Sequence, residues 1–169
     1  MTLVTAKTAK TVKTRARTVK PVVRRRVVAR ARIAAPPPVT AAATSADAWI
    51  FQLPYTTPPL TLNQRLPWRV KARVTAEVRG AAFALAKHAK VPKNCGRVRV
   101  TLIYRPKDQR RRDAINLVST LKAVEDGLVD ARIVPDDTPV YIDPVMPQIW
   151  PRDPAQTAGD LWVLVERLA

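Results

Sequence analysis

The first 46 residues contain no acidic residue, and this feature limits how much of the 169-residue chain can fold. They carry eleven lysines and arginines, together with three consecutive prolines at Pro36–Pro38. Uncompensated positive charge, β-branched residues and prolines together disfavour a packed core. We therefore predict that residues 1–46 form a disordered basic arm, rich in Thr, Lys, Arg and Pro, and that residues 47–169 form a single folded domain.

The folded part is itself moderately basic and poor in the residues that usually bind zinc. Residues 47–169 hold nineteen lysines and arginines against thirteen acids, a net charge of +6. Such a charge favours a polyanion, most simply DNA or RNA, because each neutralised phosphate releases counterions. Cys95 is the only cysteine and His88 the only histidine, which excludes disulfide frameworks and Cys- or His-rich metal sites. A bound metal would need oxygen ligands, which favours Mg²⁺ or Mn²⁺.

The sequence gives no sign of a membrane partner. No apolar run approaches the roughly 18 residues that a membrane-spanning helix needs, and the N-terminus lacks the apolar core of a secretory signal. Organelle transit peptides share the acid-free, arginine-rich composition of the arm, so this second interpretation of residues 1–46 stays open. The first interpretation places the protein in the cytoplasm.

Hydrophobic periodicity in the domain predicts elements in the order β-α-β-α-β-β. Apolar residues recur at helical spacing from Trp68 to about Lys90 and again from Asp113 to Asp130. Alternating basic and apolar residues predict a half-buried strand at 97–104. The other predicted strands lie at 49–53, within 140–149 and within 161–167. This order implies an α+β fold in which two helices cover a small mixed sheet.

The predicted helix that begins at Asp113 has two faces. Its apolar stripe consists of Ala114, Leu117, Val118, Leu121, Val124 and Leu128. A different, mostly polar face carries Ile115, Ser119, Lys122 and Asp126. Ile115 is the only large apolar side chain on that face, and core packing does not readily explain it. Asp113 by itself would be explained as a helix N-cap, whose carboxylate accepts backbone N–H groups.

Two further acids, Asp136 and Asp137, follow Pro135 downstream of this helix. The sequence Asp-Asp-Thr-Pro alone is typical of an ordinary surface turn. A metal site is the alternative, because adjacent carboxylates repel one another unless a cation lies between them. The basic run Arg110–Arg112 and the helix aspartate that precede this turn favour a divalent metal beside a phosphate backbone.

Together these motifs resemble the signature of the RusA-type Holliday junction resolvases of bacteria and their phages. In that signature Asp-x-Asp-Asn opens a helix, and a lysine, an aspartate and a terminal Asp-Asp follow. The matching residues here are Asp113-Ala114-Ile115-Asn116, Lys122, Asp126 and Asp136-Asp137. The stretch Leu53–Arg65 also resembles that family's first strand and Pro/Asn loop. The resemblance covers residues 49–167, and the basic arm has no counterpart in the short members of the family.

The resemblance implies a homodimer that binds four-way DNA junctions and cuts two opposing strands, using Mg²⁺ or Mn²⁺ held by carboxylates. Carried over, the catalytic residues are Asp113, Lys122 and Asp137, and the metal ligands are Asp113, Asp137 and, as a substitute, Asp136. The second essential carboxylate of the family falls on Ile115, which cannot bind a metal. Arg132 stands where the family commonly has a glycine, so we expect the left-handed cap after the helix to be built differently.

Nucleic acid is expected to contact basic and amide side chains of both parts of the chain. In the domain these are Arg97, Arg99, Lys107, Arg110, Arg111, Arg112 and Asn116, and in the arm they are Arg24, Arg25 and Arg26. The resemblance places the protein in a bacterial host, associated with the nucleoid.

Three functional hypotheses stay open. The first is a metal-dependent junction endonuclease that acts in DNA recombination and repair. The second is a resolvase-like protein that has lost catalysis and binds nucleic acid or a nucleoprotein partner. The third is a structural protein whose arm threads into an RNA- or DNA-rich assembly.

Overall fold

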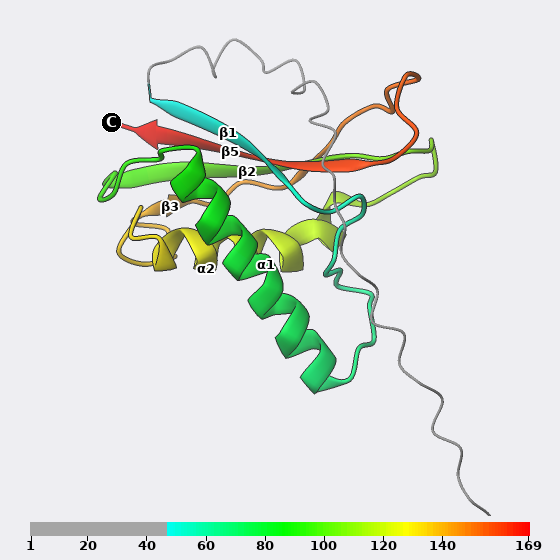
Figure 1. Cartoon of the computed structure of the whole chain (residues 1–169), viewed down its shortest axis with the longest axis horizontal. Coiled ribbons are helices and arrows are strands. Elements are labelled where there is room, and N and C mark those ends of the chain that lie inside the picture. Colours follow the sequence, from blue (N-terminus) through cyan, green and yellow to red (C-terminus); the bar gives the residue numbers. More distant parts are fainter. Residues whose placement is uncertain (1–46) are drawn as a thin grey trace, which may run out of the picture.

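The sheet is built around β2 (Arg97–Arg105) and β5 (Asp160–Leu168), which pair antiparallel along their whole length. In the computed structural model, which describes residues 47–169, β1 (Ala48–Leu53) pairs antiparallel with the other side of β5. Two short strands, β3 (Ile142–Asp143) and β4 (Gln148–Ile149), pair in parallel with β2. The sheet is therefore mixed, with the order β1-β5-β2-β3 and β4 beside β2 (Figure 1).

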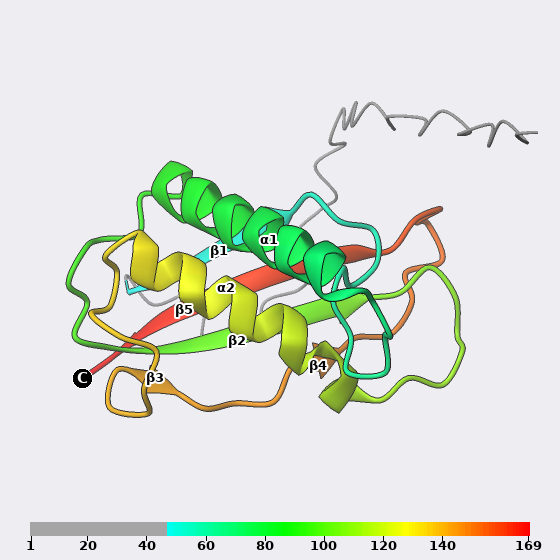
Figure 2. The ribbon, with the colours of Figure 1, turned by 90° about the horizontal axis from the view of Figure 1, so that it is seen from below.

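Two helices cover one face of this sheet, α1 (Trp68–His88) and α2 (Val118–Asp130) (Figure 2). A short 3₁₀ turn, η2 (Ala114–Leu117), precedes α2. The two helices pack closely at Gly127, where an added Cβ would lie 2.5 Å from the carbonyl oxygen of Arg79. Glycine is therefore needed at this crossing, because any larger residue would push the helices apart.

The core lies between the sheet and the helices. Alternate side chains of the central strands point into it, because successive residues of a strand face opposite sides. They are Val98, Val100 and Leu102 from β2, and Leu161, Val163 and Val165 from β5. The helices contribute Val78, Leu121, Val124 and Leu128, all buried. A smaller cluster of Ile103, Trp162 and Leu164 occupies the opposite face of the sheet.

The predicted fold class is confirmed: a mixed sheet with two helices. The predicted third strand is in fact two short ones, since Pro144 and Pro147 interrupt the ladder between β3 and β4. The predicted helix at 113–130 begins as a 3₁₀ turn and becomes α-helical only at Val118. The predicted arm lies outside the described residues. Within residues 47–169, no helix has the length and apolar character needed to cross a membrane.

One expectation about the end of α2 was wrong. Arg132 has a φ of 60°, so the left-handed cap is kept although the residue is not glycine. The N–H of Arg132 donates to the carbonyl of Val129, and the N–H of Ile133 donates to that of Leu128. Ile133 is buried, and these contacts offset the strain of a left-handed arginine.

Candidate nucleic-acid site

An open pocket of about 860 Å³ lies where the loop between β1 and α1 meets the start of η2. Thr120 ties this loop to α2, because its Oγ1 accepts the N–H of Leu60 at 3.2 Å and donates to the carbonyl of Leu60 at 2.7 Å. The N–H of Leu62 also donates to the carbonyl of Asn116 at 3.3 Å. The proline-rich loop is thereby held over the helix start, and the pocket forms between them.

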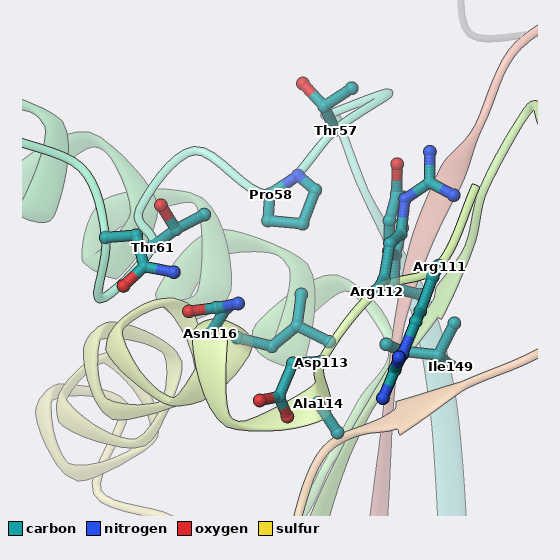
Figure 3. Close-up of a pocket in the computed structure, with 12 residues that line it drawn as sticks. Thr57, Pro58, Thr61, Arg111, Arg112, Asp113, Ala114, Asn116 and Ile149 are labelled. Carbon is teal, nitrogen blue, oxygen red and sulfur yellow. The ribbon is translucent and has the colours of Figure 1, made fainter.

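The predicted site residues Arg111, Arg112, Asp113 and Asn116 all line this pocket. Asp113 is the only acid among its lining residues. Figure 3 shows the guanidinium groups of Arg111 and Arg112 pointing in opposite directions. The pocket therefore combines one carboxylate, one amide and positive charge, which suits contact with a phosphate backbone.

Asp113 also has the structural role expected from its position. Its Oδ1 accepts the backbone N–H of Ile115 at 3.1 Å, as an N-cap does. This bond places Ile115 directly beside the carboxylate. The side chain of Ile115 is exposed, at 48 % of its maximum. A large apolar group thus faces solvent at the position where the resemblance calls for a second carboxylate.

The other predicted catalytic residues form a separate ionic cluster further along α2. Lys122 Nζ lies 3.0 Å from Asp126 Oδ1 and also contacts the carboxylate of Asp137. The carboxylate of Asp136 accepts the backbone N–H of Asp137 at 2.7 Å. Neither Lys122, Asp136 nor Asp137 lines the pocket that contains Asp113. The structure joins Lys122 to Asp137, so that the lysine is the counter-ion of this carboxylate. The place that the resemblance gives Lys122, near a scissile phosphate, stays a prediction.

The arrangement of acids does not by itself fit a divalent metal. Mg²⁺ prefers an octahedral set of oxygens, and proteins supply it with carboxylates. Within residues 47–169, no group of three or more acid, histidine or cysteine side chains is placed to hold a metal ion. Asp113 is alone at the pocket, and Lys122 already neutralises Asp137. The metal expected from the sequence therefore stays a prediction.

The basic side chains differ in what they are free to bind. Arg112 is held by the carboxylate of Asp108 at 2.5 Å and lies over the ring of Tyr104, so it shapes the loop before η2. Arg97 and Arg99 both pair with Asp143. Among residues 47–169, no acid pairs with Arg111 or Lys107, which are both exposed, and Arg110 keeps 85 % of its side chain exposed. The exposed group is the better placed to reach phosphate.

Sequence reasoning missed several members of the pocket. They are Thr57, Pro58, Thr61, Asn63, Tyr104 and Ile149. Thr57, Pro58, Thr61 and Asn63 could have been found from the sequence, because all four lie in Leu53–Arg65, the stretch that resembles the family's Pro/Asn loop. Tyr104 and Ile149 come from paired strands, β2 and β4, and only the parallel pairing of Tyr104 with Ile149 brings them to the pocket.

A half-buried acid on α2, Glu125, predicts an unusual pH dependence of stability. Burial raises the pKa of Glu125 from 4.5 to about 7; Lys122 lowers this pKa and Asp126 raises it. Because the folded protein binds this proton more tightly than the unfolded chain, Glu125 costs stability progressively from pH 4.5 to 7 and most above pH 7. Solvent reaches part of this carboxylate and screens its charge, so the full cost is at most about 3 kcal/mol.

We expect Glu125→Gln to be more stable than the native chain by up to about 3 kcal/mol at pH 8 and nearly equal to it at pH 4. Urea unfolding at both values measures the difference. The control is Glu77→Gln, an exposed acid on α1, which is expected to shift stability little at either pH. If Glu125→Gln gained the same stability at pH 4 and at pH 8, this result would contradict a raised pKa of Glu125 in the folded protein.

No protein-family model matches the chain, and no curated protein matches it.

Proposed function

We propose that residues 47–169 are a DNA-binding domain of the RusA resolvase type, which recognises branched DNA and whose strand cleavage is limited by Ile115. The observation that carries this proposal is the pocket at the start of η2. It gathers Asp113 and Asn116 of the family-like motif, together with the adjacent basic residue Arg111, on one surface of an α+β domain. The arrangement supports phosphate contact by the basic side chains, with a single carboxylate where the family places its first essential acid.

The proposal also assigns a role to the ionic cluster. Lys122, in the first half of α2, holds the carboxylate of Asp137, while the carboxylate of Asp136 accepts the backbone N–H of Asp137. In a resolvase with two carboxylates at the pocket, these groups would complete a site for Mg²⁺ or Mn²⁺. With Ile115 in place, Lys122 and Asp137 instead neutralise one another. We propose that the protein keeps DNA binding but loses most of its strand hydrolysis.

A second candidate is an active junction endonuclease with a rebuilt metal shell. The observation in its favour is that Asp113 lines an open pocket, where a phosphodiester has access to it. Both candidates share DNA as the partner, a homodimer as the assembly and the bacterial nucleoid as the location. They differ only in the chemical step. The arm, with Arg24, Arg25 and Arg26, would add sequence-independent affinity for DNA or RNA in either case.

Binding through the exposed arginine gives a direct test. Arg111→Ala is expected to weaken junction binding several-fold at moderate salt and to lower the salt slope of log K by about 1, because one phosphate contact is lost. Fluorescence anisotropy with a labelled synthetic four-way junction, at several salt concentrations, measures both quantities.

The matched control is Lys93→Ala. Lys93 is exposed and lies beside Asn94, whose N–H donates to the carbonyl of Arg132 beyond the far end of α2. It carries the same charge and is expected to change the slope much less. Equal losses in the two variants would mean that binding depends on overall charge and not on the pocket.

A further inference from the structure

The four tryptophans of the chain lie in very different surroundings. Trp162 is only 4 % exposed, Trp49 packs against the core, and Trp150 donates its indole N–H to Gln148 Oε1 at 2.9 Å. Trp68, the first residue of α1, is 73 % exposed. Packing within residues 47–169 therefore does not account for Trp68, and a large flat ring is left accessible to a ligand.

Positive charge surrounds Trp68. The sequence contains no aspartate or glutamate from residue 48 to residue 76. Arg65, Arg69 and Lys71 are exposed, and no acid among residues 47–169 pairs with them. The guanidinium carbon of Arg69 lies 5.3 Å from the centroid of the Trp68 ring. An aromatic ring surrounded by unpaired cations is complementary to a ligand that carries both flat rings and negative charge, which is the chemistry of a nucleic acid.

The start of α1 is open to such a ligand in two further respects. Its N-cap is Pro67, which makes no side-chain capping bond, and the first turn contains no acid, so the positive end of the helix dipole is not compensated there. Figure 1 shows this end of α1 as the part of the helix that lies farthest from the sheet. A bulky polymer can therefore approach it without meeting the rest of the domain.

The loop before α1 joins Trp68 to the pocket. Thr61 and Asn63 line the pocket, and the N–H of Leu62 between them donates to the carbonyl of Asn116 at 3.3 Å. Trp68 follows Asn63 by five residues, which span at most about 18 Å when extended. One DNA strand carries a phosphate about every 3.4 Å along a duplex. A strand of roughly five nucleotides can therefore contact the pocket and Trp68 together.

We propose that Trp68 stacks on an unpaired base of DNA beside a branch point, while Arg65, Arg69 and Lys71 contact the adjacent phosphates. Stacking on an aromatic side chain accepts any base, because every base has a π face. Within a duplex both faces of a base are covered by its neighbours, and at a branch this stacking is interrupted. The inference rests on the proposed function for its branched ligand and names the feature of that ligand which Trp68 recognises.

The surface fits a nucleic acid better than a membrane or a second copy of the chain. A helix that lies in a membrane surface buries a continuous apolar face, whereas Trp68 is the only exposed large apolar side chain of α1. Two copies that met at this end of α1 would bring like charges together, which is unfavourable. An unpaired strand offers both the ring and the negative charge.

Tryptophan fluorescence of the full chain, titrated with single-stranded oligothymidylate, tests the stacking directly. We expect binding to quench the native chain. Trp68→Phe is expected to lose most of the quench but to bind within about twofold of the native affinity, because a phenyl ring still stacks. Trp68→Leu, which has no ring, is expected to bind about tenfold more weakly, with an unchanged salt slope because no charge is removed.

The control is Val140→Ala, which truncates another exposed apolar side chain, in the turn before β3. It is expected to leave both the quench and the affinity unchanged. Native affinity in Trp68→Leu, an equal loss in Val140→Ala, or a full quench in Trp68→Phe would overturn the proposal. Quenching by vesicles of anionic phospholipid but not by oligothymidylate would also overturn it, because the partner would then be a membrane.

The same variants separate this inference from the proposed function. With a four-way junction and a linear duplex as ligands, Trp68→Leu is expected to lose several-fold of the preference for the junction. If the native chain prefers the junction and Trp68→Leu keeps the whole preference, the stacking role is wrong and the proposed function stands. If the native chain binds both ligands equally, the proposed function is wrong, and the oligothymidylate titration still decides whether Trp68 stacks on bases.

Discussion

Replacing Ile115 with aspartate is expected to raise Mg²⁺-dependent cleavage of a four-way junction by roughly a thousandfold, because several kcal/mol of transition-state stabilisation depend on the second carboxylate. The side chain at 115 is exposed beside Asp113, whose Oδ1 accepts the N–H of that same residue. Ile115 is not one of the residues that line the pocket, but an acid there would lie beside Asp113 at the start of η2. Two carboxylates can bind a divalent ion that one binds only weakly.

Three comparisons make this result interpretable. Ile115→Asn removes the apolar side chain without adding charge and is expected to leave cleavage near the native level. Asp113→Asn in the Ile115→Asp background is expected to abolish the gain. Mn²⁺ binding, followed by calorimetry without DNA, is expected to tighten in Ile115→Asp alone. A native chain that already cleaves as fast as Ile115→Asp would instead favour the rebuilt endonuclease.

Replacing Gly127 with alanine is expected to lower the free energy of unfolding by about 3 kcal/mol, because overpacked helix crossings must separate. A Cβ at this position would lie 2.5 Å from the carbonyl oxygen of Arg79 and 2.9 Å from Ala82 Cβ. Both are parts of α1 that cannot rotate away. Chemical denaturation measures the loss.

Gly80 provides the matched control on the neighbouring helix. It is also helical, but it is exposed and an added Cβ would meet nothing within 4 Å. Gly80→Ala is therefore expected to stabilise the protein by roughly 0.5–1 kcal/mol, the ordinary gain in helix propensity. If both substitutions stabilised the protein, the close approach of α1 and α2 at Gly127 would be wrong.

Elements with strong periodicity were predictable from the sequence. The alternation in Arg97–Arg105 and the helical spacing from Trp68 onward each depend on one buried face, and both elements form as expected. The segment at 140–149 was harder, because its prolines leave only two short pieces able to pair with β2. Arg132 was misjudged for a different reason: hydrogen bonds and burial around it outweigh the backbone preference of one residue.

The candidate site was predictable only in part. Asp113 and Asn116 are close in sequence and lie at the same pocket. Sequence spacing did not show that Lys122 would contact Asp137. The position of the turn at Asp137 depends on how the chain leaves the left-handed cap at the C-terminal end of α2. Nor did it distinguish Arg112, which Asp108 holds, from Arg111, which stays exposed. Tertiary pairing of charges decides which members of a basic run remain available, and composition does not encode it.

The central claim is recognition of branched DNA, and the most direct measurement compares two ligands that differ only in shape. The full chain would be titrated into a labelled four-way junction and into linear duplexes of the same sequences, in EDTA and at matched salt. The account predicts that the junction binds at least about tenfold more tightly, because the arm and the net charge contribute equally to both ligands. Equal affinity for junction and duplex would contradict it, and would leave a basic protein that binds nucleic acid without regard to shape.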